Sequence, residues 1–224
     1  MEIKEFKSYN AMCQLVASNI RDCVKRHSNP VLGLATGSTP IGVYELLSKM
    51  RNTHFNNTIT FNLDEYRGIN HNHRQSYHYF MRKHLFQYHN FQKNHFPNQS
   101  NLHKYDTMIK NTGGIDIQIL GIGTNGHIAF NEPGSNRHSS TRIVDLTENT
   151  INDNSRFFDP LEPIPIQAFT MGMSSIMDAK KIYLMANGKH KKDILEKACY
   201  DDITPEIPAS FLQKHKNVEV LYCD

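Results

Sequence analysis

The sequence lacks the features that define several classes of protein. Its four cysteines form no CxxC pair, and none has a histidine at a spacing typical of metal ligands (Cys13, Cys23, Cys199 and Cys223). A chain of 224 residues can bury a sizeable core without cross-links, so reduced thiols are the better interpretation. No apolar run approaches the roughly 18 residues of a membrane span, and no apolar signal-peptide segment follows Met1. We therefore expect a cytoplasmic protein with no membrane partner.

The sequence also has no strong excess of positive or negative charge. The formal net charge is only +3, from 25 Lys and Arg against 22 Asp and Glu, and the cations are scattered. This balance does not indicate nucleic-acid binding. A mild positive bias suits an anionic small molecule but is equally what chance gives. No internal repeat, low-complexity tract or interdomain linker is present, so we expect one domain over 1–224. A homo-oligomer is compatible with the sequence, which does not fix the number of subunits.

Short apolar runs alternate along the chain with stretches of helical periodicity. Strands are expected over 31–35, 58–63, 115–121, 142–146, 167–173, 181–186 and 218–223, and helices over 11–24, 41–50, 76–88, 190–198 and 208–215. Continuously apolar strands between helices predict an α/β fold, with a doubly wound, mostly parallel Rossmann-like sheet and helices on both faces. The segment 147–165 is polar and bounded by proline, which is typical of a lid over the sheet edge.

The sharpest break in this pattern follows the run 115–121. Three glycines within 121–126 end the expected strand, and His127 and Glu132 come next among apolar neighbours. Enzymes with α/β folds place reactive groups at such strand ends. Histidine titrates near neutrality, and a carboxylate partner fixes its tautomer. A lone histidine is more often structural, but the glycine spacing and the glutamate in one loop favour an acid–base pair.

A second candidate is the loop Thr36-Gly37-Ser38-Thr39, between an expected strand and an expected helix. Free backbone N–H groups, hydroxyls and the positive end of a helix suit a phosphate group. A plain helix N-cap formed by Ser or Thr is an equally good interpretation. The loop is neither a Walker loop nor GxGxxG, so it does not indicate a nucleotide.

Three charged residues complete the candidates. Asp64 follows the expected strand 58–63, where partial desolvation favours proton transfer, although a turn or helix-cap role is commoner for aspartate. Arg156 and Lys189 could close on a phosphate, although each is by default a solvated surface charge.

Histidines are concentrated between residues 71 and 95. Only His71 and His73 are closely spaced, and no cysteine joins them. A polar surface is therefore a better interpretation than a metal site. We expect no metal.

The motifs occur in an order that resembles the glucosamine-6-phosphate deaminase family of amino-sugar isomerase–deaminases. They are GLATGSTP at 33–40, FNLDEY at 61–66, GIGTNGHIAFNEP at 121–133 and NSRFF at 154–158, and the resemblance covers essentially the whole chain. The run 126–133 is highly specific to that family. The resemblance implies conversion of glucosamine 6-phosphate and water to fructose 6-phosphate and ammonium, with no cofactor and no metal.

The resemblance also implies roles for individual residues. His127, paired with Glu132, would open the pyranose ring, and Asp64 would move the C2 proton to C1 through an enolamine. The phosphate group would bind to loop and cationic residues: Gly37, Ser38, Thr39, Arg156 and Lys189.

The sequence departs from the family pattern at two places. Asn125 stands where many members have aspartate; an amide can orient the imidazole but cannot stabilise its charge, which makes Glu132 the main carboxylate partner. The stretch 143–145 (Ile-Val-Asp) lacks the lysine and threonine that longer members use to bind an N-acetylated sugar-phosphate activator. We therefore predict non-allosteric kinetics.

Two alternatives share the expected fold. The 6-phosphogluconolactonases have a Gly-His after the glycines but a different continuation, and Asp-Glu-Arg where this chain has Asp64-Glu65-Tyr66. Sugar-phosphate sensor domains of transcription regulators carry an N-terminal helix-turn-helix, whereas only one helix fits before the strand at 31–35. The joint presence of Asp64, His127 and Glu132 also argues against a sensor without activity.

Overall fold

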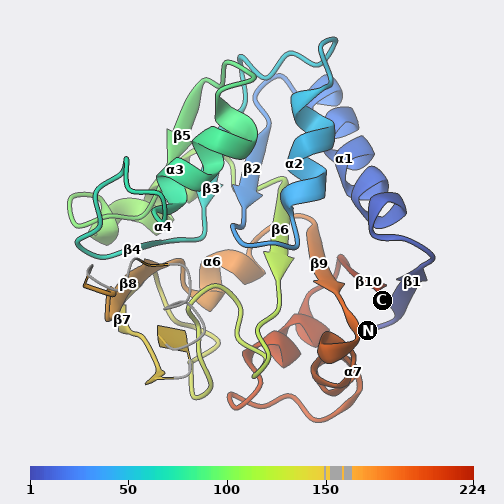
Figure 1. Ribbon diagram of the computed structural model, residues 1–224, viewed down its shortest axis with the longest axis vertical. Coiled ribbons are helices and arrows are strands. Elements are labelled where there is room, and N and C mark those ends of the chain that lie inside the picture. Colours follow the sequence, from blue (N-terminus) through green and yellow to red (C-terminus); the bar gives the residue numbers. More distant parts are fainter. Residues whose placement is uncertain (149, 152–157, 159–162) are drawn as a thin grey trace.

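The computed structural model describes residues 1–148, 150–151, 158 and 163–224, and its central element is a seven-stranded parallel sheet (Figure 1). The strands lie in the order β1 (Ile3–Phe6), β10 (Val218–Cys223), β9 (Ile182–Asn187), β6 (Ile117–Gly121), β2 (Val31–Leu34), β3 (Ile59–Asn62) and β5 (Lys93–His95). Every neighbouring pair is parallel. With helices around this sheet, the predicted α/β class is confirmed.

The strand order reverses between β2 and β6. From β2 the chain adds β3 and β5 on one side, and then returns to place β6, β9 and β10 on the other. Ligands of open α/β sheets bind outside the carboxyl ends of the strands at such a reversal. The loop that follows β2 contains Gly37, Ser38 and Thr39, and the loop that follows β6 contains Gly123 and His127.

The helices differ in length and regularity. Ser8 caps α1 (Tyr9–Arg26) by accepting a hydrogen bond from the Ala11 amide at 3.2 Å. Helical segments of the described residues also include α2 (Ile41–Ser48), α3 (Tyr77–Met81), the π-helix η1 (Arg82–Phe86), η2 (Leu102–Lys104), α4 (Tyr105–Asn111), α6 (Met173–Met177), η3 (Lys189–Lys191), α7 (Lys192–Tyr200) and η4 (Pro208–Lys214). Instead of one helix over 76–88, the chain forms α3 and then the π-helix, and 208–214 is a 3₁₀-helix.

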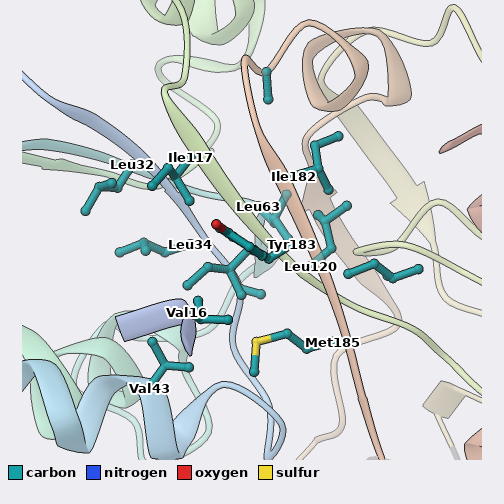
Figure 2. Close-up of a cluster of buried hydrophobic side chains, with 14 of the residues drawn as sticks. Val16, Leu32, Leu34, Val43, Leu63, Ile117, Leu120, Ile182, Tyr183 and Met185 are labelled. Atoms are coloured by element: carbon teal, nitrogen blue, oxygen red, sulfur yellow. The ribbon is translucent and has the colours of Figure 1, made fainter. Parts of the chain in front are cut away.

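The main core lies between the sheet and these helices. Figure 2 shows side chains from β2, β6 and β9 in one cluster with residues of α1 and α2: Leu32, Leu34, Ile117, Leu120, Ile182, Tyr183, Met185, Val16 and Val43. All of them are buried, as expected for a parallel sheet covered by helices. The four cysteines are buried free thiols. Within the described ranges, no helix is long and apolar enough to cross a membrane.

A second, smaller sheet corrects one part of the sequence analysis. Strands β7 (Arg142–Asp145) and β8 (Gln167–Thr170) do not join the parallel sheet; they pair antiparallel with each other, and β8 pairs antiparallel with β4 (Asp64–Tyr66). Apolar content predicts a strand but not its partner. The short strand β4 was not expected, because its polar sequence directly follows β3.

Candidate active site

The described residues enclose a cavity of about 510 Å³ beside the carboxyl ends of β2 and β6. The lining comes from separate segments of the chain: 35–39 and Ile41 after β2, Leu63, Asp64 and Tyr66 around β4, 74–77 and Phe80 near α3, 121–124, His127, Ala129 and Phe130 after β6, Thr150, and Lys191. Of the sequence-predicted residues, Gly37, Ser38, Thr39, Asp64 and His127 line this cavity together.

Asn125 and Glu132 stand behind the imidazole of His127. The Asn125 amide donates from Nδ2 to Glu132 Oε2 at 2.8 Å, and its Oδ1 lies 2.8 Å from His127 Nδ1. The same Oδ1 accepts the backbone N–H of His127 at 3.2 Å. Glu132 Oε2 is 3.4 Å from His127 Nδ1. Asn125 is therefore the closer partner of the imidazole, and Glu132 acts largely through it.

This network assigns the tautomer of His127. The Glu132 carboxylate only accepts hydrogen bonds, so the Asn125 NH₂ group faces it and the amide oxygen faces the imidazole. An amide oxygen also only accepts, so His127 Nδ1 carries a hydrogen. In the neutral ring the lone pair is then on Nε2, which is left to exchange a proton with a molecule in the cavity.

Glu132 is held in its charged form. Burial raises the pKa of its carboxyl group, but hydrogen bonds and charge from His127, together with the donors Thr150 and Asn125, outweigh this and lower it to about 2. The carboxylate therefore stays ionised throughout the neutral range.

The backbone around His127 is shaped to make room for its ring. Gly123 lies so close that a Cβ at this position would overlap the imidazole. Gly126 has φ +86°, and Ala129 has φ 53°, a left-handed conformation that is uncommon for a residue with a side chain. The glycine spacing is thus required by the loop that places His127.

Asp64 faces the cavity from the start of β4. It is 7% exposed, and none of the hydrogen bonds among the described residues involves its carboxyl group. Burial raises the pKa of Asp64 well above its ordinary value of 3.8, and the neighbouring charge of Glu65 raises it further. A carboxylate that binds protons readily beside a cavity can act as a base in catalysis.

The loop after β2 has free donors next to a helix. Gly37 has φ +90°, and the backbone N–H groups of 37–39 donate to none of the described hydrogen bonds. The Tyr9 hydroxyl braces the loop, since it lies 2.8 Å from the Thr39 carbonyl and 2.8 Å from the Gly42 amide. The loop can therefore receive an anion at the N-terminus of α2.

One predicted cation is placed away from the cavity. The Lys189 side chain is 88% exposed, lies 3.9 Å from Asp224 and does not line the cavity. Lys191, two residues later, does line it, and its Nζ donates to the Ile122 carbonyl at 2.9 Å. The turn at Gly188 (φ 97°) and the 3₁₀-helix η3 decide which lysine of this basic run faces inward. Arg156 lies outside the described residues, as does much of the predicted lid over 147–165.

Sequence reasoning also missed Arg74 and Thr150, which line the cavity. Neither residue lies next to a glycine break or at the end of an expected strand.

The histidines of 71–95 are more than a polar surface, since His78 packs against His71 and Phe96 and lies 2.7 Å from Glu65. In the described part of the chain, no group of three His, Cys, Asp or Glu residues could hold a metal ion.

A parallel α/β sheet with an acid–base cluster and an anion loop at its strand reversal is typical of enzymes that act on small phosphorylated molecules. The model of the family of glucosamine-6-phosphate isomerases and 6-phosphogluconolactonases matches residues 4–221, so the chain belongs to this family.

Individual relatives are similar to this chain over nearly its full length. The chain is 46% identical to the glucosamine-6-phosphate deaminase of Lachnoclostridium phytofermentans, over 100% of this chain and 99% of the relative. It is 44% identical to that of Oceanobacillus iheyensis, over 99% and 93%. A solved monomeric glucosamine-6-phosphate deaminase superposes with TM-score 0.95 at 37% identity, covering 100% and 97%. A 6-phosphogluconolactonase from Shewanella baltica, at 21% identity and TM-score 0.78, shares the fold.

Proposed function

We propose that this protein is an amino-sugar-phosphate isomerase that deaminates its substrate, converting glucosamine 6-phosphate and water to fructose 6-phosphate and ammonium. The observation that carries the proposal is the placement of His127, with its Nδ1 tethered, and Asp64, with its raised pKa, on one cavity beside an anion loop. The full-length relatives named glucosamine-6-phosphate deaminase support the same reaction.

Ring opening is the step that suits His127. The pyranose opens when the C1 hydroxyl loses its proton and the ring oxygen gains one. His127 Nε2 has the lone pair that can accept the first proton, and the resulting imidazolium can give it to the ring oxygen. Asn125 and Glu132 keep Nδ1 protonated throughout, so the proton that moves is the one on Nε2.

Isomerisation is the step that suits Asp64. The ionised carboxylate takes the C2 proton of the open-chain aldehyde, and the carbonyl oxygen takes a proton from the ammonium group on C2, which gives an enolamine. The same carboxyl group then returns its proton to C1, which leaves a protonated ketimine at C2. The ketimine at C2 then adds water and releases ammonia. A raised pKa makes Asp64 a stronger base than an ordinary aspartate, which the weakly acidic C2–H requires.

The loop 37–39 and Lys191 would hold the phosphate. Both lie on the cavity wall, where the loop offers backbone N–H donors and Lys191 offers a positive charge. Holding this remote group restricts the sugar so that C2 stays near Asp64, and such positioning supplies part of the rate enhancement.

The direct test is ammonium release from glucosamine 6-phosphate by the purified protein. Galactosamine 6-phosphate tests the epimer at C4, and 6-phosphogluconolactone tests the lactonase alternative. We expect ammonium and fructose 6-phosphate from the first substrate and no acceleration of lactone hydrolysis. Lactone hydrolysis without ammonium release would contradict the proposal.

We further propose that one chain, folded as a single domain and working in the cytoplasm, is sufficient for activity. A solved relative with 37% identity and a TM-score of 0.95 is described as monomeric. Activity that appears only above a threshold protein concentration in a dilution series would contradict this.

We also expect the rate to depend hyperbolically on the substrate concentration, and N-acetylglucosamine 6-phosphate to leave this dependence unchanged.

A further inference from the structure

The two carboxylate oxygens of Glu132 have different partners. Oε2 accepts from Asn125 at 2.8 Å and faces His127, whereas Oε1 accepts from the Thr150 hydroxyl at 2.5 Å. Glu132 is 8% exposed and Thr150 is 7% exposed, so water has little access to this contact. Thr150 follows β7 and is 18 positions away from Glu132 in the sequence.

The Thr150 hydroxyl group has a defined hydrogen-bond partner both as a donor and as an acceptor. Because the Glu132 carboxylate is ionised, the single hydroxyl hydrogen of Thr150 must point to Oε1. The Thr150 oxygen is then free to accept the Thr147 hydroxyl at 3.0 Å, and the Thr150 amide donates to Thr147 Oγ1 at 3.2 Å. The two hydroxyl groups thus form a short hydrogen-bond chain from Thr147 through Thr150 to the Glu132 carboxylate.

The torsion that rotates a glutamate carboxylate is broad, so a single hydrogen bond to Oε2 does not define the plane of the group. A second donor on Oε1 defines it. The orientation of the Asn125 amide follows from Oε2, and the tautomer of His127 follows from the Asn125 oxygen. Thr150 is therefore two contacts away from the imidazole but acts on the same hydrogen-bond chain.

We propose that Thr150 is a positioning residue for ring opening: its hydroxyl fixes the Glu132 carboxylate, and thereby Asn125 and the Nδ1–H tautomer of His127. The inference rests on the proposed function and adds a residue to its proton-transfer machinery.

The test compares Thr150→Val, which keeps the branched shape and removes the hydroxyl, with Thr150→Ser, which keeps the hydroxyl. Losing a hydrogen bond to a charged group predicts a fall in kcat of about 10- to 100-fold for Thr150→Val. We expect a nearly unchanged KM, because the hydroxyl is committed to Glu132, and recovery of most of kcat in Thr150→Ser. In the ¹⁵N NMR spectrum, His127 should change from one tautomer to a mixture in Thr150→Val.

Thr112→Val is the control, since it removes a threonine hydroxyl that donates to the Ile109 carbonyl at 2.8 Å and lies outside the cavity lining. The proposal is overturned if Thr112→Val lowers kcat as much as Thr150→Val, or if Thr150→Val leaves both kcat and the His127 tautomer unchanged. These outcomes are separate from failure of the proposed function, which the wild-type protein reveals by releasing no ammonium. The NMR measurement needs no turnover.

Discussion

The imidazole of His127 occupies the space that any side chain at Gly123 would need. A Cβ at this position would overlap ring atoms of His127. We therefore expect Gly123→Ala to push the ring out of its contact with Asn125 and to reduce ammonium release by about 10²-fold, the usual cost of a misplaced catalytic group. Gly121→Ala is the comparison, because it adds the same methyl group to another glycine of the cavity lining without meeting any protein atom within 4 Å. Equal activity of the two variants would contradict the assigned contact.

Asp64 should lower the stability of the folded protein at neutral pH. Its pKa is raised by burial above the ordinary 3.8, so above pH 3.8 the folded chain retains a proton that the unfolded chain releases. The free energy of unfolding therefore falls as the pH rises through this window. Asp64→Asn should abolish ammonium release yet raise Tm by a few degrees at neutral pH, since each kcal/mol shifts Tm by about 2–4 °C at this size.

Calorimetry at several pH values checks this expectation for Asp64→Asn. The gain in Tm should shrink as the pH is lowered through 3.8, because below this pH the folded and the unfolded wild-type chain both carry the proton. The exposed Asp201→Asn serves as the control, with no such trend. A variant less stable than wild type at neutral pH would show that the Asp64 carboxylate is stabilised in a way that the geometry does not contain.

The two lysines of the basic run after β9 should differ in their effect on substrate binding. Lys191→Ala removes a cation from the cavity wall, and we expect KM for glucosamine 6-phosphate to rise by about 10- to 100-fold. Lys189→Ala changes an exposed residue near Asp224 and should leave KM unchanged. Inorganic phosphate as a competitive inhibitor gives a second measurement: its inhibition constant should rise in parallel only for Lys191→Ala.

Glu132→Gln places an amide where the structure needs two hydrogen-bond acceptors. Its NH₂ group would meet either the Thr150 hydroxyl or the Asn125 NH₂ group, so one contact must break. We expect kcat to fall by about 10²- to 10⁴-fold, the range for loss of acid–base catalysis. The wild-type carboxylate, with its pKa lowered from 4.5 to about 2, stabilises the fold above pH 4.5.

Acid unfolding provides the independent measurement for Glu132. The stability that its lowered pKa contributes is lost as the pH falls from 4.5 toward 2, so the difference in unfolding free energy between wild type and Glu132→Gln should narrow over that range. Near-normal turnover by Glu132→Gln would remove this residue from the proposed relay.

The sequence predicted the parts of the site that local pattern determines. Glycine breaks after apolar strands located Gly37 and His127, and the parallel class followed from continuously apolar runs. Which lysine of a basic run faces inward depends on the turn at Gly188, and position along the chain does not reveal it. Thr150 could not be found either, because its role arises from a contact with a residue 18 positions away.

Strand β8 contacts the segments that carry both proton-transfer groups. The Thr170 backbone is the ladder partner of Asp64, and the Thr170 hydroxyl accepts the Phe130 amide at 3.1 Å, within the loop that bears His127. Asn131 adds a hydrogen bond from its Nδ2 to the Met171 carbonyl at 2.9 Å. Thr170 and Met171, which take no part in the chemistry, thus connect the segment of the base to the loop of the imidazole, and a change at Thr170 would alter the separation between the two groups without removing either one.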